Sequence, residues 1–200
     1  MPPYDREQTT RRIFDAAVRE FAAEGIGGAR IDRIAQAAES NKALIYSYFG
    51  NKEQLFAAVV QRKLTELAEA VTLRADGAEQ YIGDLFDFMT AHPEVLRLVQ
   101  HEACHYEVRD IPDHDARKAH YEEKVDAVRA AQQTGSVDPA LEPRFVVMSL
   151  ISLVSWYVAA PQIAELVVGD TANKTVRRQY RAHLVEMARR MLRQDESGEA

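Results

Sequence analysis

The sequence predicts an all-helical protein of 200 residues. Apolar residues recur at spacings of three and four along most of the chain, which is the pattern of amphipathic helices. No stretch alternates apolar and polar residues for long enough to indicate a strand. We therefore expect an N-terminal three-helix domain with a helix-turn-helix. A long fourth helix is expected to join it to a C-terminal helical bundle.

Three short helices are predicted before residue 51. Apolar residues follow one face of the first helix, residues 6–24, and the glycines at 25, 27 and 28 end it. A second short helix is expected over residues 31–38. The third is expected over residues 42–49, with Asn41 as its N-cap because the amide oxygen of asparagine accepts from free backbone N–H groups.

The helices after residue 51 are predicted to be longer. The fourth begins at Lys52 and is expected to end near residues 75–77, where a glycine follows. Pro161 is expected to close the most apolar helix. The remaining helices are predicted at residues 81–91, 94–108, 116–134, 143–160 and 173–193.

The composition favours a protein of the cytoplasm. The single cysteine, Cys104, excludes an intramolecular disulfide and fits a reducing compartment. The first six residues are polar and lack the apolar core of a signal peptide. The longest apolar stretch, residues 145–160, is interrupted by three serines and is shorter than the roughly 20 residues of a membrane span. We expect no membrane association, and disorder only in the tail, residues 194–200.

The distribution of charge directs attention to the third helix. The chain has a net charge of −6, yet residues 1–63 carry ten Lys or Arg and eight Asp or Glu. No acidic residue lies between Ser40 and Asn51. A helix that faces DNA must avoid carboxylates, because each would repel phosphate. The predicted outer face of the third helix carries Lys42, Ala43, Tyr46 and Ser47.

The segment from Thr10 to Phe56 resembles the DNA-binding domain of TetR-family repressors. Two departures from the family pattern stand in the loops. Glu39-Ser40-Asn41 replaces the usual Gly-Val-Ser of the turn, and Ala29-Arg30 replaces the usual Thr or Ser before the second helix. The matching residues are Ile13, Ala16, Ala17, Phe21, Gly25, Ile34, Ala35, Ala38, Lys42, Ile45, Tyr46, Tyr48, Phe49, Lys52, Glu53 and Leu55.

The resemblance implies a ligand-responsive transcriptional repressor rather than an enzyme. It would bind a palindromic operator in double-stranded DNA as a homodimer, and a small-molecule effector of unknown identity would release it; no cofactor is expected. The implied domains are a DNA-binding domain (1–51), a connecting helix (52–76) and an effector-binding and dimerisation domain (77–200).

The implied DNA contacts fall into two kinds. Tyr46 and Lys52 resemble the family's phosphate contacts, and Arg30 is placed to reach a further phosphate. The candidates for contacts to base edges in the major groove are Lys42, Ala43, Leu44, Ser47 and Tyr48. The full set of expected DNA-binding residues is Arg30, Asn41, Lys42, Ala43, Leu44, Tyr46, Ser47, Tyr48 and Lys52.

The resemblance also places an effector pocket and a dimer surface in the C-terminal part. The last two predicted helices are expected to form the dimer surface, including Tyr180, Leu184 and Met191. The pocket would be mostly apolar with a few polar groups. Its expected residues are Tyr81, Phe88, Met89, His101, Cys104, His105, Tyr121, Met148, Trp156 and Tyr157.

One motif favours a different class of protein. His101-Glu102-x-x-His105 has the spacing of a helical zinc hydrolase, with two histidines on one face and a glutamate as general base. The continuation with a glycine and a third histidine is absent. A zinc-dependent hydrolase, or a metal sensor that also uses Cys104, is therefore the alternative to a repressor.

Overall fold

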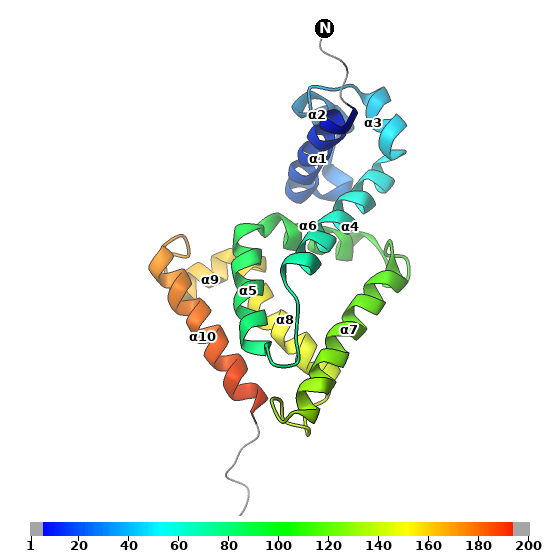
Figure 1. Ribbon diagram of the computed structural model, residues 1–200. Helices are drawn as coiled ribbons and strands as arrows, with labels where there is room; N and C mark the ends of the chain where they lie inside the picture. Colours follow the sequence, from blue (N-terminus) through cyan, green and yellow to red (C-terminus); the bar gives the residue numbers. More distant parts are fainter. Residues whose placement is uncertain (1–5, 194–200) are drawn as a thin grey trace, which may run out of the picture. The chain divides into compact units, whose positions relative to one another are not determined.

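The computed structural model describes residues 6–193 and contains ten α-helices and no strand within them (Figure 1). This confirms the all-helical prediction. The first five residues lie outside the described residues. So does the tail at residues 194–200, the one segment for which we predicted disorder. The chain divides into two compact units. The first contains residues up to 66 together with 94–114, and the second contains 67–93 and the chain from 115 onward.

Each unit is a set of packed helices. The first unit holds α1 (Arg6–Gly28), α2 (Ile31–Ala37), α3 (Lys42–Phe49), most of α4 (Lys52–Ala70) and all but the first residue of α6 (Pro93–His105). The second unit holds the end of α4, α5 (Ala78–Ala91), nearly all of α7 (His114–Gln133), α8 (Pro143–Ala159), α9 (Pro161–Val168) and α10 (Lys174–Leu192).

The core of the first unit is built by helices that are distant in sequence. Phe21 of α1 and Phe56 of α4 are fully buried, and their rings meet edge to face with centroids 5.1 Å apart. Leu98 of α6 belongs to the same core, as do Ile34 of α2 and Ile45 of α3. Burial of these large side chains away from water supplies the main favourable term for this packing.

Gly25 interrupts α1 and allows α6 to approach. Its backbone lies at φ 64° and ψ 178°, so the regular helix ends where the glycine was expected to end it. Glycine adopts a positive φ without the steric cost of a side chain. A Cβ at this position would lie 2.7 Å from Nδ1 of His101, so the imidazole of α6 occupies the space that any other residue would need.

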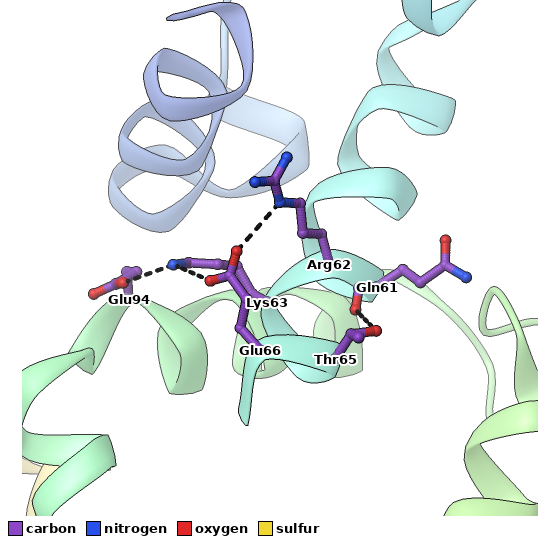
Figure 2. A network of polar contacts seen from close by, with 6 residues as sticks. All are labelled: Gln61, Arg62, Lys63, Thr65, Glu66 and Glu94. Carbon is purple, nitrogen blue, oxygen red and sulfur yellow. Dashed lines mark hydrogen bonds and ion pairs between the residues drawn. The ribbon is translucent and has the colours of Figure 1, made fainter. Parts of the chain in front are cut away.

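An ion-pair network joins α4 to the first turn of α6 (Figure 2). Nζ of Lys63 lies 2.9 Å from Glu66 and 3.3 Å from Glu94, and Arg62 lies 3.2 Å from Glu66. Partial burial lowers the pKa of Lys63, but the hydrogen bonds and charges of the two glutamates outweigh it, so the pKa lies above its usual value. The lysine is therefore charged and holds the two helices together.

The second unit packs around α5, which lies against both α8 and α10. Phe86 of α5 contacts Tyr157 of α8 and Tyr180 of α10, at centroid distances of 5.2 and 5.7 Å. The two tyrosine rings stack on each other at 4.7 Å. Arg181 adds a 2.7 Å ion pair to Asp87 at the edge of this aromatic cluster.

Two predicted helix ends were wrong. α4 ends at Ala70 rather than near residues 75–77. Val71 and Leu73 are buried while Thr72 between them is exposed, and this alternation suits extended chain rather than a helix. α6 ends at His105 rather than Val108, whose side chain is 76% exposed and has no apolar surface to cover.

The sequence analysis also missed α9. Pro161 does end α8, but it then occupies the first turn of a new helix, where its missing N–H is not needed. Within residues 6–193, no single helix is long and apolar enough to cross a bilayer; α8 and α9 reach that length and composition only when counted as a pair bent by 90°.

Glu39 stands in the turn between α2 and α3 with a positive φ of 49°. The family pattern has glycine there, and a residue with a Cβ pays a steric cost in this conformation. We predict that Glu39→Gly raises the free energy of unfolding by about 0.5–1 kcal/mol. Urea denaturation followed by circular dichroism measures this change.

The matched control is Glu39→Ala. It removes the same carboxylate and its 3.0 Å pair with Arg12, but it keeps the Cβ. Both partners of that pair are exposed, so the pair contributes little. An equal gain in the glycine and alanine variants would contradict backbone strain as the cause.

Candidate nucleic-acid interface

The helix-turn-helix is formed by α2 and α3 and the four residues between them. The Leu44 backbone N–H donates to Oδ1 of Asn41 at 2.9 Å, which confirms that Asn41 caps α3. Ile34, Ala38 and Ile45 are buried and hold the two helices on the core of the first unit. The position of α3 is therefore fixed from its buried side, and its opposite side is exposed.

The start of α2 is held by a residue that the sequence analysis did not identify. The backbone N–H of Arg30 donates to Oε1 of Glu20 at 2.9 Å, and Nε of Arg33 donates to the same oxygen at 2.8 Å. Arg33 also pairs with Glu24 at 3.3 Å. A carboxylate on α1 thus holds the backbone of Arg30, the residue before α2, although no side chain caps the first turn of α2 itself. The side chain of Arg30 stays exposed.

The outer face of α3 carries the four side chains that the sequence placed there. Lys42, Ala43, Tyr46 and Ser47 are all exposed, Tyr46 by 48%. No acidic residue belongs to α3, so no carboxylate of this helix would face phosphate. The helix therefore offers an ammonium, a phenol, a hydroxyl and a methyl group on one surface.

Lys42 is not free on this surface. Its Nζ lies 2.7 Å from Asp32 at the start of α2. The hydrogen bond and the charge of Asp32 raise the pKa of Lys42, so the group is charged. A base or phosphate must compete with this exposed carboxylate, and the sequence analysis did not foresee that partner.

Leu44 and Tyr48 are more enclosed than the other expected base readers. Both are half-buried, and Tyr48 packs against the core of the first unit. The guanidinium of Arg6 lies over the ring of Tyr48 at 5.0 Å from its centroid. Tyr48 therefore connects the start of α1 to α3 and exposes only part of its ring.

Lys52 lies at the first residue of α4. Its Nζ donates to the carbonyl oxygen of Ala29 at 3.5 Å, which places the ammonium beside the loop that carries Arg30. Lys52 and the backbone that carries Arg30 thus lie at the same end of the helix-turn-helix. A helix start also presents unpaired backbone N–H groups, which favour a phosphate.

The ten residues expected to line an effector pocket are divided between the two units. His101, Cys104 and His105 lie on α6 in the first unit, and the other seven lie in the second. Tyr81, Met89 and Tyr157 are buried and Phe88 is half-buried. The remaining three are exposed, and these are Tyr121 by 47%, Met148 by 63% and Trp156 by 63%. Their common role in one pocket stays a prediction.

The His101-Glu102-x-x-His105 motif does not form a metal site in the described part of the chain. His101 packs on Gly25, Glu102 is buried, and the exposed His105 packs its ring edge to face on Tyr106 at 4.6 Å. Between residues 6 and 193, no three His, Cys, Asp or Glu side chains are grouped as a metal ion requires. The spacing alone gives no support to a zinc hydrolase.

Comparison with known proteins agrees with this geometry. Residues 13–59 match the family model for bacterial regulatory proteins of the tetR family, and residues 78–190 match the tetracyclin repressor-like C-terminal domain. The HTH-type transcriptional repressor SCO4008 of Streptomyces coelicolor is 44% identical over 169 residues, which cover 84% of this chain and 88% of that protein.

Solved structures share the fold over nearly the whole chain. The putative transcriptional regulator SCO4942 from Streptomyces coelicolor superposes with a TM-score of 0.81 at 35% identity, covering 92% of this chain and 98% of that one. AibR, solved with isovaleryl coenzyme A and operator DNA, gives a TM-score of 0.69 at 21% identity over 90% of this chain and 97% of that one. On the family matches and the repressor relative, this chain belongs to the TetR family of bacterial transcriptional regulators.

Proposed function

We propose that this ligand-responsive TetR-family repressor binds a palindromic operator as a homodimer and leaves it when a small organic effector binds. The observation that carries the proposal is the outer face of α3, which has no carboxylate and is held out from the core by α1 and α2. A recognition helix in the major groove requires such a surface. We place the protein in the cytoplasm, where operator DNA is found, and assign it no enzymatic activity.

The two kinds of DNA contact have different candidates. Arg30, Tyr46 and Lys52 are proposed to contact phosphates, because they offer a guanidinium, a phenol and an ammonium at the ends of the recognition surface. Lys42, Ala43 and Ser47 are proposed to face base edges from the exposed side of α3. Leu44 and Tyr48 are weaker candidates for base contacts because both are half-buried.

A dimer supplies the second recognition helix. We propose that α8 and α10 form its surface, because Phe145, Met148 and Trp156 are 72%, 63% and 63% exposed along one face of α8. The small Ser152 lies on the same face and permits close approach of another helix. Two of the residues expected there point inward instead: Leu184 is buried, and Tyr180 stacks on Tyr157. Their side chains are occupied within the unit.

We propose that effector binding in the second unit changes the position of α4. The two chain segments that carry this change into the first unit are the end of α4 and the start of α6. The chain passes between the units after Glu66 and before Glu94, and Lys63 binds both carboxylates (Figure 2). An effector that binds one arrangement of the dimer better than the other shifts the population toward it. AibR, a neighbour in fold, was solved with a coenzyme A thioester and operator DNA, which supports this type of response.

The proposed domains are those expected from the sequence. Residues 1–51 are proposed as the DNA-binding domain and 52–76 as the connecting segment, whose helix α4 ends at Ala70. Residues 77–200 are proposed as the effector-binding and dimerisation domain, although α6 within this range packs in the first unit. The buried pocket candidates of the last domain, Tyr81 and Met89, suit the apolar part of an effector. A zinc hydrolase or metal sensor is not proposed further, because the residues of the motif are not gathered around one point.

The direct test is a footprint on the DNA that adjoins the protein's own reading frame. We predict protection of a palindrome whose half-sites are about one helical turn apart, because two recognition helices related by a two-fold axis enter adjacent major grooves. A purified protein that stays monomeric and binds no duplex at low ionic strength would overturn the proposal.

Lys52→Ala is predicted to weaken binding to all DNA sequences alike. Loss of one phosphate contact reduces the slope of log K against log salt by about 1 per site. Equilibrium binding at several salt concentrations measures the slope. Lys52→Arg should keep it, and Lys118→Ala, which removes an exposed lysine of α7, should leave it unchanged. An unaltered slope in Lys52→Ala rules out the phosphate role.

Lys42→Ala is predicted to alter sequence preference rather than salt dependence. A lysine that donates to a guanine edge contributes about 1–3 kcal/mol of discrimination at that base pair. Binding to operator variants with single base changes measures it. Asp32→Asn is the control, because it releases Lys42 from its 2.7 Å ion pair and should tighten binding while keeping the preference. Uniform weakening across all operator variants would speak against base reading by Lys42.

A further inference from the structure

Lys124 of α7 is a largely covered lysine, and it forms no ion pair with any of residues 6–193. Its side chain is 8% exposed, and it belongs to the second unit. Its ammonium lies 5.5 Å from the ring centroid of Tyr81, a cation–π distance. Within the described chain, no carboxylate pairs with the ammonium and it donates no hydrogen bond, yet Nζ is not among the fully enclosed polar atoms and keeps some contact with solvent. Burial lowers the pKa of Lys124, and the nearby Glu123 opposes this only in part.

An unpaired ammonium inside a protein reduces stability. A charged group that leaves water loses its hydration, and only a counter-charge or several hydrogen bonds compensate for that loss. The face of one tyrosine ring provides part of this compensation. By comparison, the partly buried Lys63 has two carboxylates within 3.3 Å. A negatively charged partner would therefore stabilise the ammonium of Lys124.

Tyr81, Tyr121 and His120 near Lys124 donate hydrogen bonds or carry no charge, whereas the adjacent Glu123 is negative. Tyr81 is 3% exposed, and burial together with Tyr121 raises its pKa to about 12, so its hydroxyl stays protonated. Tyr121 lies three residues before Lys124 on α7, on the same side of the helix. Burial and the charge of Lys124 lower the pKa of His120, one residue earlier. The adjacent carboxylate, Glu123, is exposed and lies 3.6 Å from His120.

We propose that Lys124 binds the carboxylate of the effector, a small organic acid whose apolar part lies against Tyr81. The inference rests on the proposed ligand-responsive function and names the chemical class of its ligand. One ammonium matches the single charge of a carboxylate, whereas a phosphate group carries up to two charges and usually binds to several cations or backbone N–H groups. Tyr81 and Tyr121 were expected pocket residues, and Lys124 supplies the charge that their set lacked.

The first test needs no ligand. Lys124→Met keeps the length of the side chain and removes the unpaired charge. We expect its melting temperature to equal that of the wild type or to exceed it by about 2–4 °C at matched protein concentration. Lys118→Met, which changes an exposed lysine of the same helix, should stay within about 2 °C. A fall of more than about 4 °C in Lys124→Met would assign Lys124 a structural partner and overturn the proposal.

The second test compares charge at constant shape. Benzoate, 3-phenylpropanoate, 1-naphthoate and decanoate are each added to the full-length protein, alongside the primary amide and the amine of the same carbon skeleton. Binding to the folded state raises the melting temperature. We expect at least one carboxylate to raise it by several degrees and its amide and amine to have no comparable effect. Lys124→Met should abolish this increase, and Lys118→Met should retain it.

Three outcomes would overturn the inference. These are an absence of preference for any of the four carboxylates over its amide, a preference for the amines, and a carboxylate effect that persists in Lys124→Met. Operator binding by the same preparations separates this inference from the proposed function. Wild-type protein that binds its operator but shows no carboxylate preference refutes only the inference. Protein that discriminates carboxylates through Lys124 but binds no DNA refutes only the repressor function.

Discussion

The edge-to-face contact between Phe21 and Phe56 is the interaction on which the recognition surface depends. Both rings are fully buried, and they fix α1 against α4. α2 and α3 have only seven and eight residues, so they are too short to be stable alone and take their positions from this core. Glu20 then anchors the start of α2 to α1 through the Arg30 backbone. The exposed face of α3 is thus set by contacts made on the opposite side.

Local sequence signals predicted the first three helices well. Apolar spacing, the glycines after residue 24 and the asparagine cap each act over a few residues, and the structure has the helix starts at Arg6, Ile31 and Lys42. Prediction failed where distant contacts decide. The chain leaves α4 before Val71 and Leu73, which are buried and belong to the second unit. α9 follows a proline that had been interpreted only as the end of a helix. The burial of Val71 and Leu73 cannot be seen from the residues that flank them in sequence. Pro161 is a local signal, but a proline is compatible both with the end of one helix and with the first turn of the next.

The difference between local and distant contacts also explains which partners at the candidate nucleic-acid interface were not predicted. The exposed set on α3 follows from helical periodicity, and it was predicted. The partners that control it lie far along the chain: Asp32 is ten residues from Lys42, and Glu20 is ten residues from Arg30. Lys124 was not singled out from the sequence, because composition does not reveal which side of α7 is covered. The spacing of His101, Glu102 and His105 in the sequence matches a zinc site, but within residues 6–193 these side chains are not grouped with a further ligand around one point.

The membership of α6 in the first unit has a consequence for engineering. Leu98 completes the core of that unit, and His101 fills the space above Gly25, although both lie more than thirty residues beyond the end of the helix-turn-helix. The unit that carries the helix-turn-helix is therefore discontinuous in sequence. A chimera that grafts residues 1–66 onto a foreign sensor would lack Leu98 in its core and His101 over Gly25 unless it also carries residues 94–114 or an equivalent helix. Whether a foreign effector-binding domain can be fused to this helix-turn-helix would then depend on whether it supplies a helix that packs as α6 does.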